Sequence, residues 1–351
     1  MAPRHLFLPD LIWPLDPDTG RYPVVDRVDD PVRWRAWADA DTPIVTQWDD
    51  GRHAGPAPGR TATSSSSEPS LVAGMLTDLD VRPGQRVLDV GAGTGWTTAL
   101  LTACAGGRGV VGVELDPEVA GAARARLRAA GVDAPVVTGD GADGWADAAP
   151  YDRVQCTYGV LRVPPAWIVQ TRPGGVIVAP WRTRFAHRGA VVRLTVGADG
   201  TASGRFTRVA EFMQSRPERQ EWLEHTDYVP PGGAWPVGTV KSTSTLGPEE
   251  LGGFAVGILV PGVVHTVNEA ANGTITAWLY ALRDRSWAAV FFDGDPEAEV
   301  YQGGERRLWD EVEAAHRWWI GHGRPGQERF GLTTGPEGET AWLDRPDRPL
   351  R

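Results

Sequence analysis

Asp89-Val90-Gly91-Ala92-Gly93-Thr94-Gly95 is the stretch that decides the fold of this 351-residue chain. A short apolar strand is predicted before it, over 86–90, and a helix after it, over 97–104. Glycines where a strand ends and a helix begins let the backbone approach a ligand closely, and the first turn of a helix offers free N–H groups. The stretch therefore predicts a nucleotide-like ligand at the carboxyl end of a strand.

Strands continue to alternate with helices away from this turn. We expect strands over 109–114, 135–138, 151–156 and 175–180, and helices over 70–79, 117–130 and 164–170. Strands separated by helix-length segments imply parallel crossovers, so the predicted fold class is α/β with an open, doubly wound, mostly parallel sheet. The segments 190–196 and 201–209 flank Gly197-Ala198-Asp199-Gly200 and predict a hairpin that closes the sheet with an antiparallel edge.

The chain divides into three regions by composition and pattern. We expect a cap segment over 1–60, a ligand-binding domain over 61–215 and a C-terminal α+β extension over 216–351. Within the extension, the pattern predicts apolar segments near 254–264, strands near 274–280 and 287–292, and a helix near 305–320.

Composition and charge exclude several classes of partner. The formal net charge of -10 argues against nucleic acid, because phosphate binding usually requires a basic field. The longest apolar stretch, 254–264, is too short to span a bilayer, so no membrane partner is expected, and no signal peptide is recognised. Cys104 and Cys156 form neither a metal-ligand pair nor a disulfide framework, which favours a cytoplasmic protein without a bound metal. The sequence makes no prediction of oligomeric state.

The spacing of the glycines distinguishes between two nucleotide-like ligands. A dinucleotide-binding turn has the pattern Gly-x-Gly-x-x-Gly/Ala, which would place a small residue at position 96. Trp96 stands there instead, and a bulky side chain is expected to crowd a pyrophosphate. S-adenosylmethionine has no phosphates, so it is the favoured cofactor and a nicotinamide dehydrogenase is disfavoured.

Acidic residues after later strands extend the predicted cofactor site. Glu114 ends the strand 109–114, where a carboxylate can hold two ribose hydroxyls, although NAD and S-adenosylmethionine share this diol. Asp140-Gly141 follows the next strand, where such folds place adenine contacts. A plain Asp-Gly turn is the alternative role for this pair.

Segments on both sides of the glycine-rich turn resemble protein-L-isoaspartate O-methyltransferases. Residues 67–73, Ser-Glu-Pro-Ser-Leu-Val-Ala, look like the family's Ser-x-Pro-x-x-Val-Ala segment, which is more specific than the glycine motif. The other matching segments are Arg4-His5-Leu6-Phe7-Leu8-Pro9, Ala40-Asp41-Thr42-Pro43, Val87 to Gly95, Gly139-Asp140-Gly141, Tyr151-Asp152, Arg172-Pro173-Gly174-Gly175 and Glu211-Phe212-Met213.

This resemblance covers residues 1 to about 215 and implies a class I methyltransferase fold. It implies S-adenosylmethionine as cofactor and S-adenosylhomocysteine as its product. The cofactor-binding residues that it implies are Asp89, Gly91, Ala92, Gly93, Thr94, Gly95, Trp96, Glu114, Leu115, Asp140 and Gly141.

The resemblance also implies an acceptor site just upstream, in the run Ser64-Ser65-Ser66-Ser67. Ser67 would hydrogen-bond the acceptor carboxylate, with Ser66 and Ser65 as further orienting hydroxyls and Ser64 beside the substrate. A helix cap is the alternative role for Ser67. His53, in the preceding loop, is expected at the substrate entrance, with an exposed loop histidine as the alternative.

Carboxyl methylation of a peptide or protein bearing aspartate or isoaspartate is the activity that the resemblance implies. The serine run stands where the family usually has Thr-Ile-Ser, and the extension 216–351 follows the matching region. This combination resembles the branch associated with ribosomally made peptide natural products, in which an aspartate of a modified precursor is methylated and the ester cyclises to an aspartimide. Isoaspartate repair and a non-catalytic cofactor-binding adaptor are the alternatives.

Overall fold

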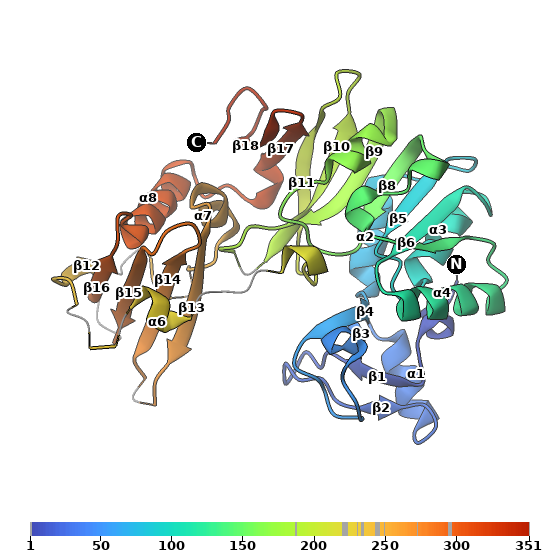
Figure 1. Cartoon of the computed structure of the whole chain (residues 1–351), viewed down its shortest axis with the longest axis horizontal. Helices are drawn as coiled ribbons and strands as arrows, with labels where there is room; N and C mark the ends of the chain where they lie inside the picture. The colour runs from blue at the N-terminus through green and yellow to red at the C-terminus, as the bar shows by residue number, and fades with distance from the viewer. Residues whose placement is uncertain are drawn as a thin grey trace.

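Three β-sheets carry the structure, which is a computed structural model (Figure 1). It describes residues 2–186, 188–219, 224–229, 231–232, 235–242, 246–248, 250–271, 273–293 and 297–350. The largest sheet has nine strands in the order β18-β17-β11-β10-β9-β8-β5-β6-β7. A four-stranded N-terminal sheet and a five-stranded C-terminal sheet form two lobes beside it (Figure 1).

The central sheet is doubly wound, and five of its strands are parallel. These strands are β5 (Val87–Val90), β6 (Val110–Glu114), β7 (Val136–Thr138), β8 (Tyr151–Cys156) and β9 (Thr171–Trp181). The chain runs outward from β5 through β6 to β7, then returns to the other side of β5 for β8 and β9. Ligands of such sheets bind where the strand order reverses, which here is at the carboxyl ends of β5 and β8.

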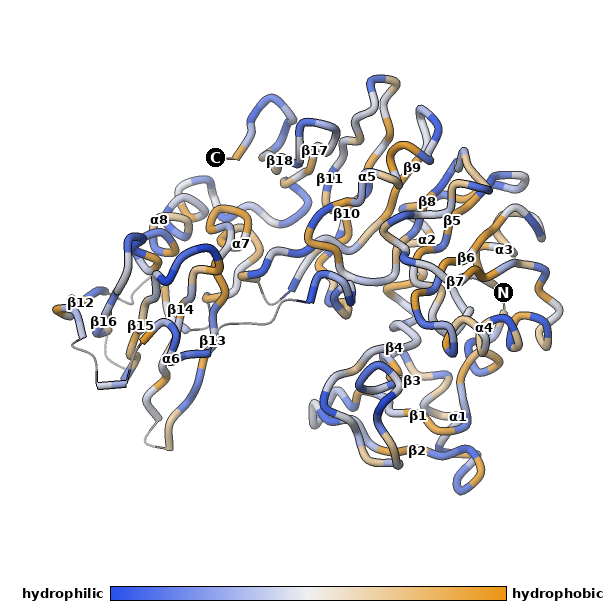
Figure 2. Tube along the Cα trace, viewed as in Figure 1, coloured by the Kyte–Doolittle hydropathy of each residue, from blue (hydrophilic) through white to orange (hydrophobic). Residues whose placement is uncertain are grey.

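Apolar side chains on both faces make these segments interior strands. β5 is buried along its whole length, and Figure 2 shows hydrophobic residues concentrated in the central strands. The helices around the sheet are α2 (Pro69–Leu79), α3 (Trp96–Cys104), α4 (Pro117–Ala129) and α5 (Pro165–Val169). Met75 of α2 and Leu101 of α3 pack on one face of the sheet, and Trp167 of α5 packs on the opposite face.

The antiparallel side of the sheet extends beyond the predicted hairpin. β10 (Gly189–Val196) and β11 (Ala202–Ala210) form that hairpin, but β11 then pairs with β17 (Phe330–Gly335), which pairs with β18 (Gly338–Leu343). The outer edge is therefore a second hairpin, formed where the chain returns from the C-terminal lobe. Glu339 of β18 accepts hydrogen bonds from the backbone N of Val163 at 3.0 Å and from Nε1 of Trp181 at 2.7 Å.

The N-terminal unit is a small sheet that extends past the predicted boundary at residue 60. It comprises β1 (Leu11–Pro14), β2 (Val25–Asp26), α1 (Pro31–Asp39), β3 (Ile44–Trp48) and β4 (Ala62–Ser66). The order of its strands is β2-β1-β3-β4, so β4 belongs to this unit and not to the central domain. Arg4 is buried here, and its guanidinium donates to the carbonyl oxygens of Ala40, Thr42 and Ser66 and to Oγ of Ser66.

The C-terminal lobe is an antiparallel sheet with helices on both faces. Its strands in spatial order are β12 (Thr239–Ser242), β16 (Glu297–Gly303), β15 (Trp287–Phe292), β14 (Ile275–Ala281) and β13 (Val263–Glu269). Its helices are α6 (His225–Tyr228), α7 (Phe254–Leu259) and α8 (Leu308–Gly321). The strands and the long helix lie near the predicted positions. The extension is not one separate block, however, because β17 and β18 belong to the central sheet.

Within the described part of the chain, no helix is both long and apolar enough to cross a membrane. The same residues include no group of three or more His, Cys, Asp and Glu side chains that could hold a metal ion. Cys104 and Cys156 are both free; the first is exposed and the second is buried at the end of β8.

Candidate active site

A cavity lies at the carboxyl ends of β5 and β8, where the strand order reverses. The predicted cofactor residues that line it are Gly91, Gly93, Glu114, Leu115, Asp140 and Gly141. β4 of the N-terminal unit contributes Thr63, Ser64 and Ser65, and the segment after β11 contributes residues between Met213 and Arg219. The cavity is therefore built from the central sheet, the N-terminal unit and the chain that leaves β11.

Glycine is required at two points of this lining because Tyr158 leaves no room for a side chain. Gly91 has φ +80°, and a Cβ there would lie 2.8 Å from Cδ1 of Tyr158. At Gly141 a Cβ would lie 2.5 Å from Cγ1 of Val90 and 2.7 Å from the hydroxyl oxygen of Tyr158. Tyr158 thus packs directly on the glycine backbone, and burial raises the pKa of its hydroxyl well above the usual value.

Glu114 ends β6 with its carboxylate at the cavity. Its Oε2 accepts a hydrogen bond from the backbone N of Gly93 at 2.9 Å, and its Oε1 accepts from the backbone N of Asp116 at 3.1 Å. These bonds fix the carboxylate at the edge of the glycine turn. Each oxygen keeps a second lone pair, so the group can still accept from two hydroxyls of a ligand.

Asp140 forms the Asp-Gly turn and also faces the cavity. Its Oδ1 accepts from the backbone N of Ala142 at 2.9 Å and caps the 3-10 turn Gly141–Asp143. This bond uses one carboxylate oxygen, and Asp140 also lines the cavity. The Asp-Gly turn therefore leaves acceptor capacity for a ligand.

Asp89 lies beneath the glycine turn and does not line the cavity. Its side chain is completely buried, and Oδ2 accepts from the hydroxyl of Thr98 at 2.6 Å. Oδ1 has no hydrogen-bond partner among the described residues. Burial raises the pKa of Asp89 to about 7; Glu114 adds to the shift and the Thr98 hydrogen bond opposes it. Asp89 therefore ties the turn to α3, and its predicted contact with the cofactor stays a prediction.

Other predicted cofactor residues also face away from the cavity. Trp96 packs in the core beside the N-terminal segment, where its Nε1 donates to the carbonyl oxygen of Ala2 at 3.1 Å and Arg4 lies over its ring. The predicted crowding of a pyrophosphate by Trp96 is therefore wrong, since the first turn of α3 directs this side chain inward. Three more predicted cofactor residues do not line the cavity: Ala92, Thr94 and Gly95.

Strand β4 carries three of the four serines of the predicted acceptor site, and Ser67 follows its last residue. Successive side chains of a strand point to opposite faces, so these serines do not all share one environment. Oγ of Ser64 accepts from the hydroxyl of Thr46 at 3.3 Å, and Oγ of Ser66 accepts from Nε of Arg4 at 3.0 Å. Both serines are buried. Ser66 is thus a structural residue of the N-terminal unit and does not point to a substrate, contrary to the expected orienting role.

Ser65 and Ser67 line a groove, which we call the acceptor groove, that adjoins the cavity. Residues that line both are Ser65, Thr157, Met213 and Gln214. Within the described chain the hydroxyls of Ser65 and Ser67 make no hydrogen bond. The alternative role of Ser67 as a helix cap is not seen, because Glu68 is the N-cap of α2 and Asp41 accepts from the backbone N of Ser70 at 2.8 Å.

His53 does not lie at the acceptor groove. It lines a different cavity, between the N-terminal sheet and α4, together with Trp13 and Trp48. Its Nε2 contacts the carbonyl oxygen of Ala57 at 2.7 Å, and its Nδ1 lies 3.8 Å from the carboxylate of Asp49. These contacts hold the ring within its own loop, so the predicted place at the substrate entrance stays a prediction.

Comparison with protein families identifies the chain. The family described as protein-L-isoaspartate(D-aspartate) O-methyltransferase matches residues 28–209, which is just over half of the 351 residues. The chain belongs to this family.

Its relatives in the protein-L-isoaspartate O-methyltransferase family are similar over the central domain. The protein of this name from Methanopyrus kandleri is 37% identical over 182 residues, which are 51% of this chain and 65% of the relative. That from Anaeromyxobacter dehalogenans is 42% identical over 150 residues, 42% of this chain and 70% of the relative. That from Ignicoccus hospitalis matches over 57% of its own length. The matched region thus spans about two thirds or less of several relatives.

The likeness in fold reaches further than the likeness in sequence. A solved structure titled protein-L-isoaspartate O-methyltransferase superposes with a TM-score of 0.54 and 22% identity, and covers 98% of this chain and 92% of that one. This alignment of folds thus extends beyond the central domain into the C-terminal lobe.

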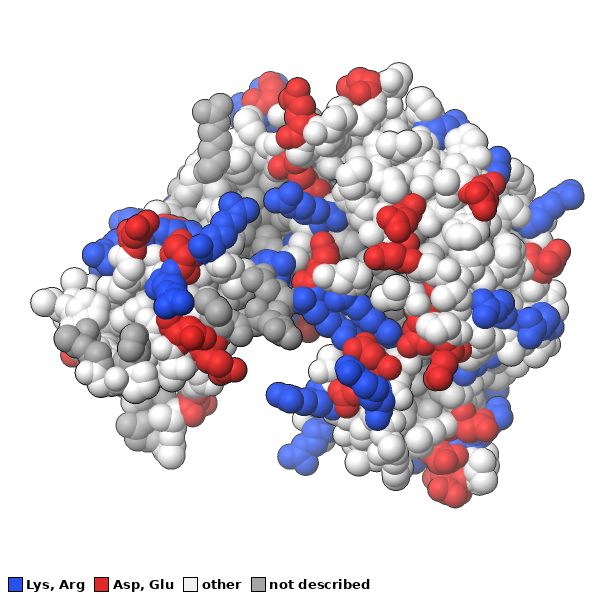
Figure 3. Space-filling view, viewed as in Figure 1, with Lys and Arg blue, Asp and Glu red and all other residues white. Residues whose placement is uncertain are grey.

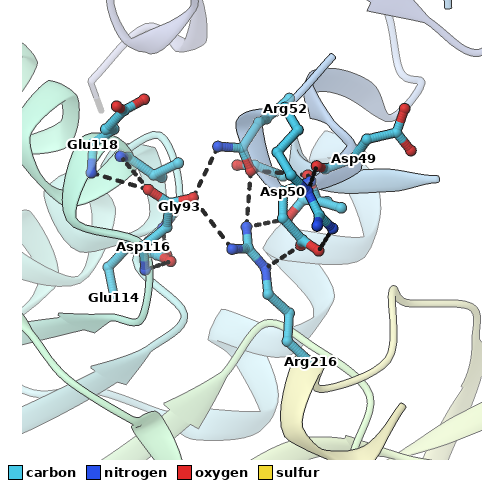
Figure 4. Close-up of polar contacts among 12 residues, drawn as sticks. Asp49, Asp50, Arg52, Gly93, Glu114, Asp116, Glu118 and Arg216 are labelled. Atoms are coloured by element: carbon cyan, nitrogen blue, oxygen red, sulfur yellow. Dashed lines mark hydrogen bonds and ion pairs between the residues drawn. The ribbon is translucent and has the colours of Figure 1, made fainter. Parts of the chain in front are cut away.

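In this family member, Arg216 is a residue of the site that the sequence did not single out (Figure 4). Its Nη2 donates to Oε1 of Gln47 at 2.8 Å and to the carbonyl oxygen of Thr63 at 2.9 Å, and its Nη1 donates to Oδ2 of Asp116 at 3.2 Å. Its Nε lies 3.2 Å from Oδ1 of Asp50. Arg216 thus joins the segment over the cavity to both the N-terminal unit and the start of α4.

Further lining residues were also missed, and most of them lie far from the motif in sequence. The cavity residues without a predicted role are Thr63, Val113, Thr157, Tyr158, Met213, Gln214, Ser215, Arg216, Pro217 and Arg219. One signal could have found some of them: Thr157 and Tyr158 directly follow β8, the second strand at the point where the order reverses.

Proposed function

We propose that this protein is an S-adenosylmethionine-dependent carboxyl O-methyltransferase that esterifies the side chain of an L-isoaspartyl residue in a peptide or protein. One observation carries the proposal: the free hydroxyls of Ser65 and Ser67 lie in the groove that adjoins the glycine-lined cavity. Family membership and relatives named protein-L-isoaspartate O-methyltransferase support it.

The polar groups of the cavity fit S-adenosylmethionine. Glu114 would hold the ribose hydroxyls, Asp140 would contact the adenine, and the backbone at Gly91 and Gly93 allows close approach of the rest of the ligand. When bound, this cofactor supplies a methyl group that is activated by the positive charge on sulfur.

The residues of the chain then orient the reactants and exclude water, and they do not need to move a proton. The acceptor carboxylate has a reference pKa near ~3.9 and is ionised at neutral pH. Its oxygen bonds to the methyl carbon as the carbon–sulfur bond breaks, and that electron pair stays on sulfur, so the step balances without a base. Neutral hydroxyls at Ser65 and Ser67 can align the oxygen without the loss of nucleophilicity that a tight ion pair causes.

An assay with a synthetic peptide that carries one L-isoaspartyl residue tests the proposal. We expect the peptide mass to increase by one methyl group as S-adenosylhomocysteine forms, and the same peptide with ordinary aspartate serves as the comparison. If neither peptide is esterified while S-adenosylmethionine still binds, the proposal fails and the adaptor hypothesis is favoured.

Substitution of single serines separates the acceptor hydroxyls from the structural ones. We expect Ser67→Ala to lower kcat/KM by about tenfold, because one hydrogen bond to an ionised group contributes roughly 1.5 kcal/mol. Ser66→Ala is the matched control: it removes an acceptor of Arg4 and is expected to lower thermal stability with little change in kcat/KM. Equal effects of both substitutions on kcat/KM would contradict this assignment.

A second acceptor is favoured by the size of the acceptor groove, which has a volume of about 930 Å³. A space of this size supports a constrained peptide segment, such as an aspartate within a modified, ribosomally made precursor, whose ester would cyclise to an aspartimide. The C-terminal extension would then help to hold the precursor. Gain of one methyl group followed by loss of methanol on such a precursor supports this reading, whereas turnover of linear isoaspartyl peptides alone excludes it.

A further inference from the structure

Two arginines line the acceptor groove without a carboxylate partner. Arg182 follows β9, and Arg188 precedes β10. Among the described residues neither guanidinium has a carboxylate oxygen within 4.0 Å, and Nε of Arg182 donates only to the carbonyl oxygen of Thr183, at 3.4 Å. Around the recess between the lobes, basic and acidic side chains lie side by side (Figure 3).

A third arginine of the same groove, in contrast, has a carboxylate partner. Arg208 forms an ion pair with Oδ2 of Asp78 at 2.7 Å and donates to the carbonyl oxygen of Gly74 at 3.2 Å. Its charge is therefore used within the fold. Arg182, which is partly buried, and Arg188, which is exposed, have no such ion pair among the described residues.

The stem of Arg182 is packed between two glycines. A Cβ at Gly159 would lie 3.3 Å from Cδ of Arg182, and a Cβ at Gly189 would lie 3.0 Å from its Cβ. Burial lowers the pKa of Arg182, and the negative charge of Glu211 opposes this shift. Two weaker effects are that Arg184 lowers this pKa and Glu218 raises it. A partly desolvated guanidinium without an ion pair is unfavourable in the free protein, and an anionic ligand would restore the lost interaction.

The acceptor carboxylate is not the ligand that this charge suits, because a tight ion pair would make its oxygen a weaker nucleophile. Ser65 and Ser67 provide neutral donors for that group. Glu68 and Glu211 also line the groove, so its field is not uniformly positive and any preference for an anion is confined to a short part of the peptide.

We propose that Arg182 and Arg188 bind a second carboxylate of the acceptor peptide and thereby select substrates with an acidic residue close to the methylated one. Planar guanidinium groups can bind a carboxylate through two parallel hydrogen bonds, which suits this task. The inference rests on the proposed function for the identity of the acceptor, and it adds an acidic peptide as the substrate class.

Binding of paired synthetic peptides tests this selection. Each peptide carries one L-isoaspartyl residue and a single Glu at one of the three positions on either side, and its twin has Gln in place of that Glu. Affinity for the protein saturated with S-adenosylhomocysteine is measured by fluorescence anisotropy, and methylation of the same peptides is followed by mass. We expect at least one Glu peptide to bind about tenfold more tightly than its twin, with the advantage decreasing as salt increases.

The variants Arg182→Gln and Arg188→Gln are expected to reduce that advantage, and together to remove it. Arg108→Gln is the matched control, because Arg108 is an exposed arginine in the turn before β6 and its substitution changes the net charge equally. Equal binding of every Glu and Gln twin, an advantage that survives the double variant, or no binding of any peptide would overturn the inference. Binding with the Glu preference but without methylation would instead overturn only the proposed function.

Discussion

Glu114→Ala is expected to weaken binding of S-adenosylmethionine by roughly 100-fold or more. The carboxylate is the group best placed to accept from both ribose hydroxyls, and hydrogen bonds to a charged group contribute about 1.5–3 kcal/mol each. The substitution also leaves the backbone N–H of Gly93 without its acceptor, which loosens the turn itself. Isothermal titration with S-adenosylhomocysteine measures the effect directly.

Glu118→Ala is the control for this result. Glu118 lies in the first turn of α4 and does not line the cofactor cavity, although its substitution removes the same charge from the same neighbourhood (Figure 4). We expect its affinity to stay within about twofold of the original protein. If Glu114→Ala binds as well as Glu118→Ala, the cofactor does not occupy this cavity in the proposed orientation.

Asp89→Asn is expected to stabilise the protein at alkaline pH. Burial raises the pKa of Asp89 to about 7 from its ordinary value of 3.8. The free energy that this group contributes is therefore fully present below its unfolded pKa and is lost as the pH rises through 7. A rise of this size in the pKa corresponds to about 4 kcal/mol, which is the order of the folding free energy that is lost when Asp89 is ionised above pH 7.

The test compares the free energy of unfolding of both proteins in urea between pH 4 and pH 8. The advantage of Asp89→Asn is expected to be largest at pH 8 and to decrease as the pH falls towards 4, since the other groups titrate in both proteins alike. Thr98 can still donate to the amide oxygen of the new side chain, so the observed hydrogen bond is retained. A difference between the two proteins that does not change with pH would show that Asp89 titrates normally.

The central sheet was predictable because parallel interior strands are apolar on both faces and are separated by helices. The strand predicted over 151–156 has the same bounds as β8, and the others differ by a few residues at most at their starts and ends. The strands of the N-terminal unit were not predicted because they are short and rich in Pro, Trp and Asp. β17 and β18 carry glycines at 331, 335 and 338, which resemble loop positions until the pairing with β11 is known.

The site was predictable where it depends on strand ends and not where it depends on side-chain direction. Gly91, Gly93 and Glu114 follow from the ends of β5 and β6. Which serine faces the groove depends on the register of β4. The direction of the Trp96 side chain depends on which face of α3 packs against the core. The Arg216–Asp116 contact joins residues 100 positions apart and has no local signal.

The return of β17 and β18 to the central sheet sets an order for biosynthesis. The family-matched region ends at residue 209, yet the outer edge of β11 at residues 202–205 pairs with residues 331–334. A nascent chain that has left the ribosome as far as β11 thus presents an unpaired strand edge, the kind of surface that promotes aggregation, throughout synthesis of the C-terminal lobe. Glu339, which accepts hydrogen bonds from Val163 and Trp181, is synthesised after the C-terminal lobe. The loop beside the cavity is therefore secured only at the end of translation of this chain, and ribosome stalling within the lobe would leave a domain with its motifs present but its sheet incomplete.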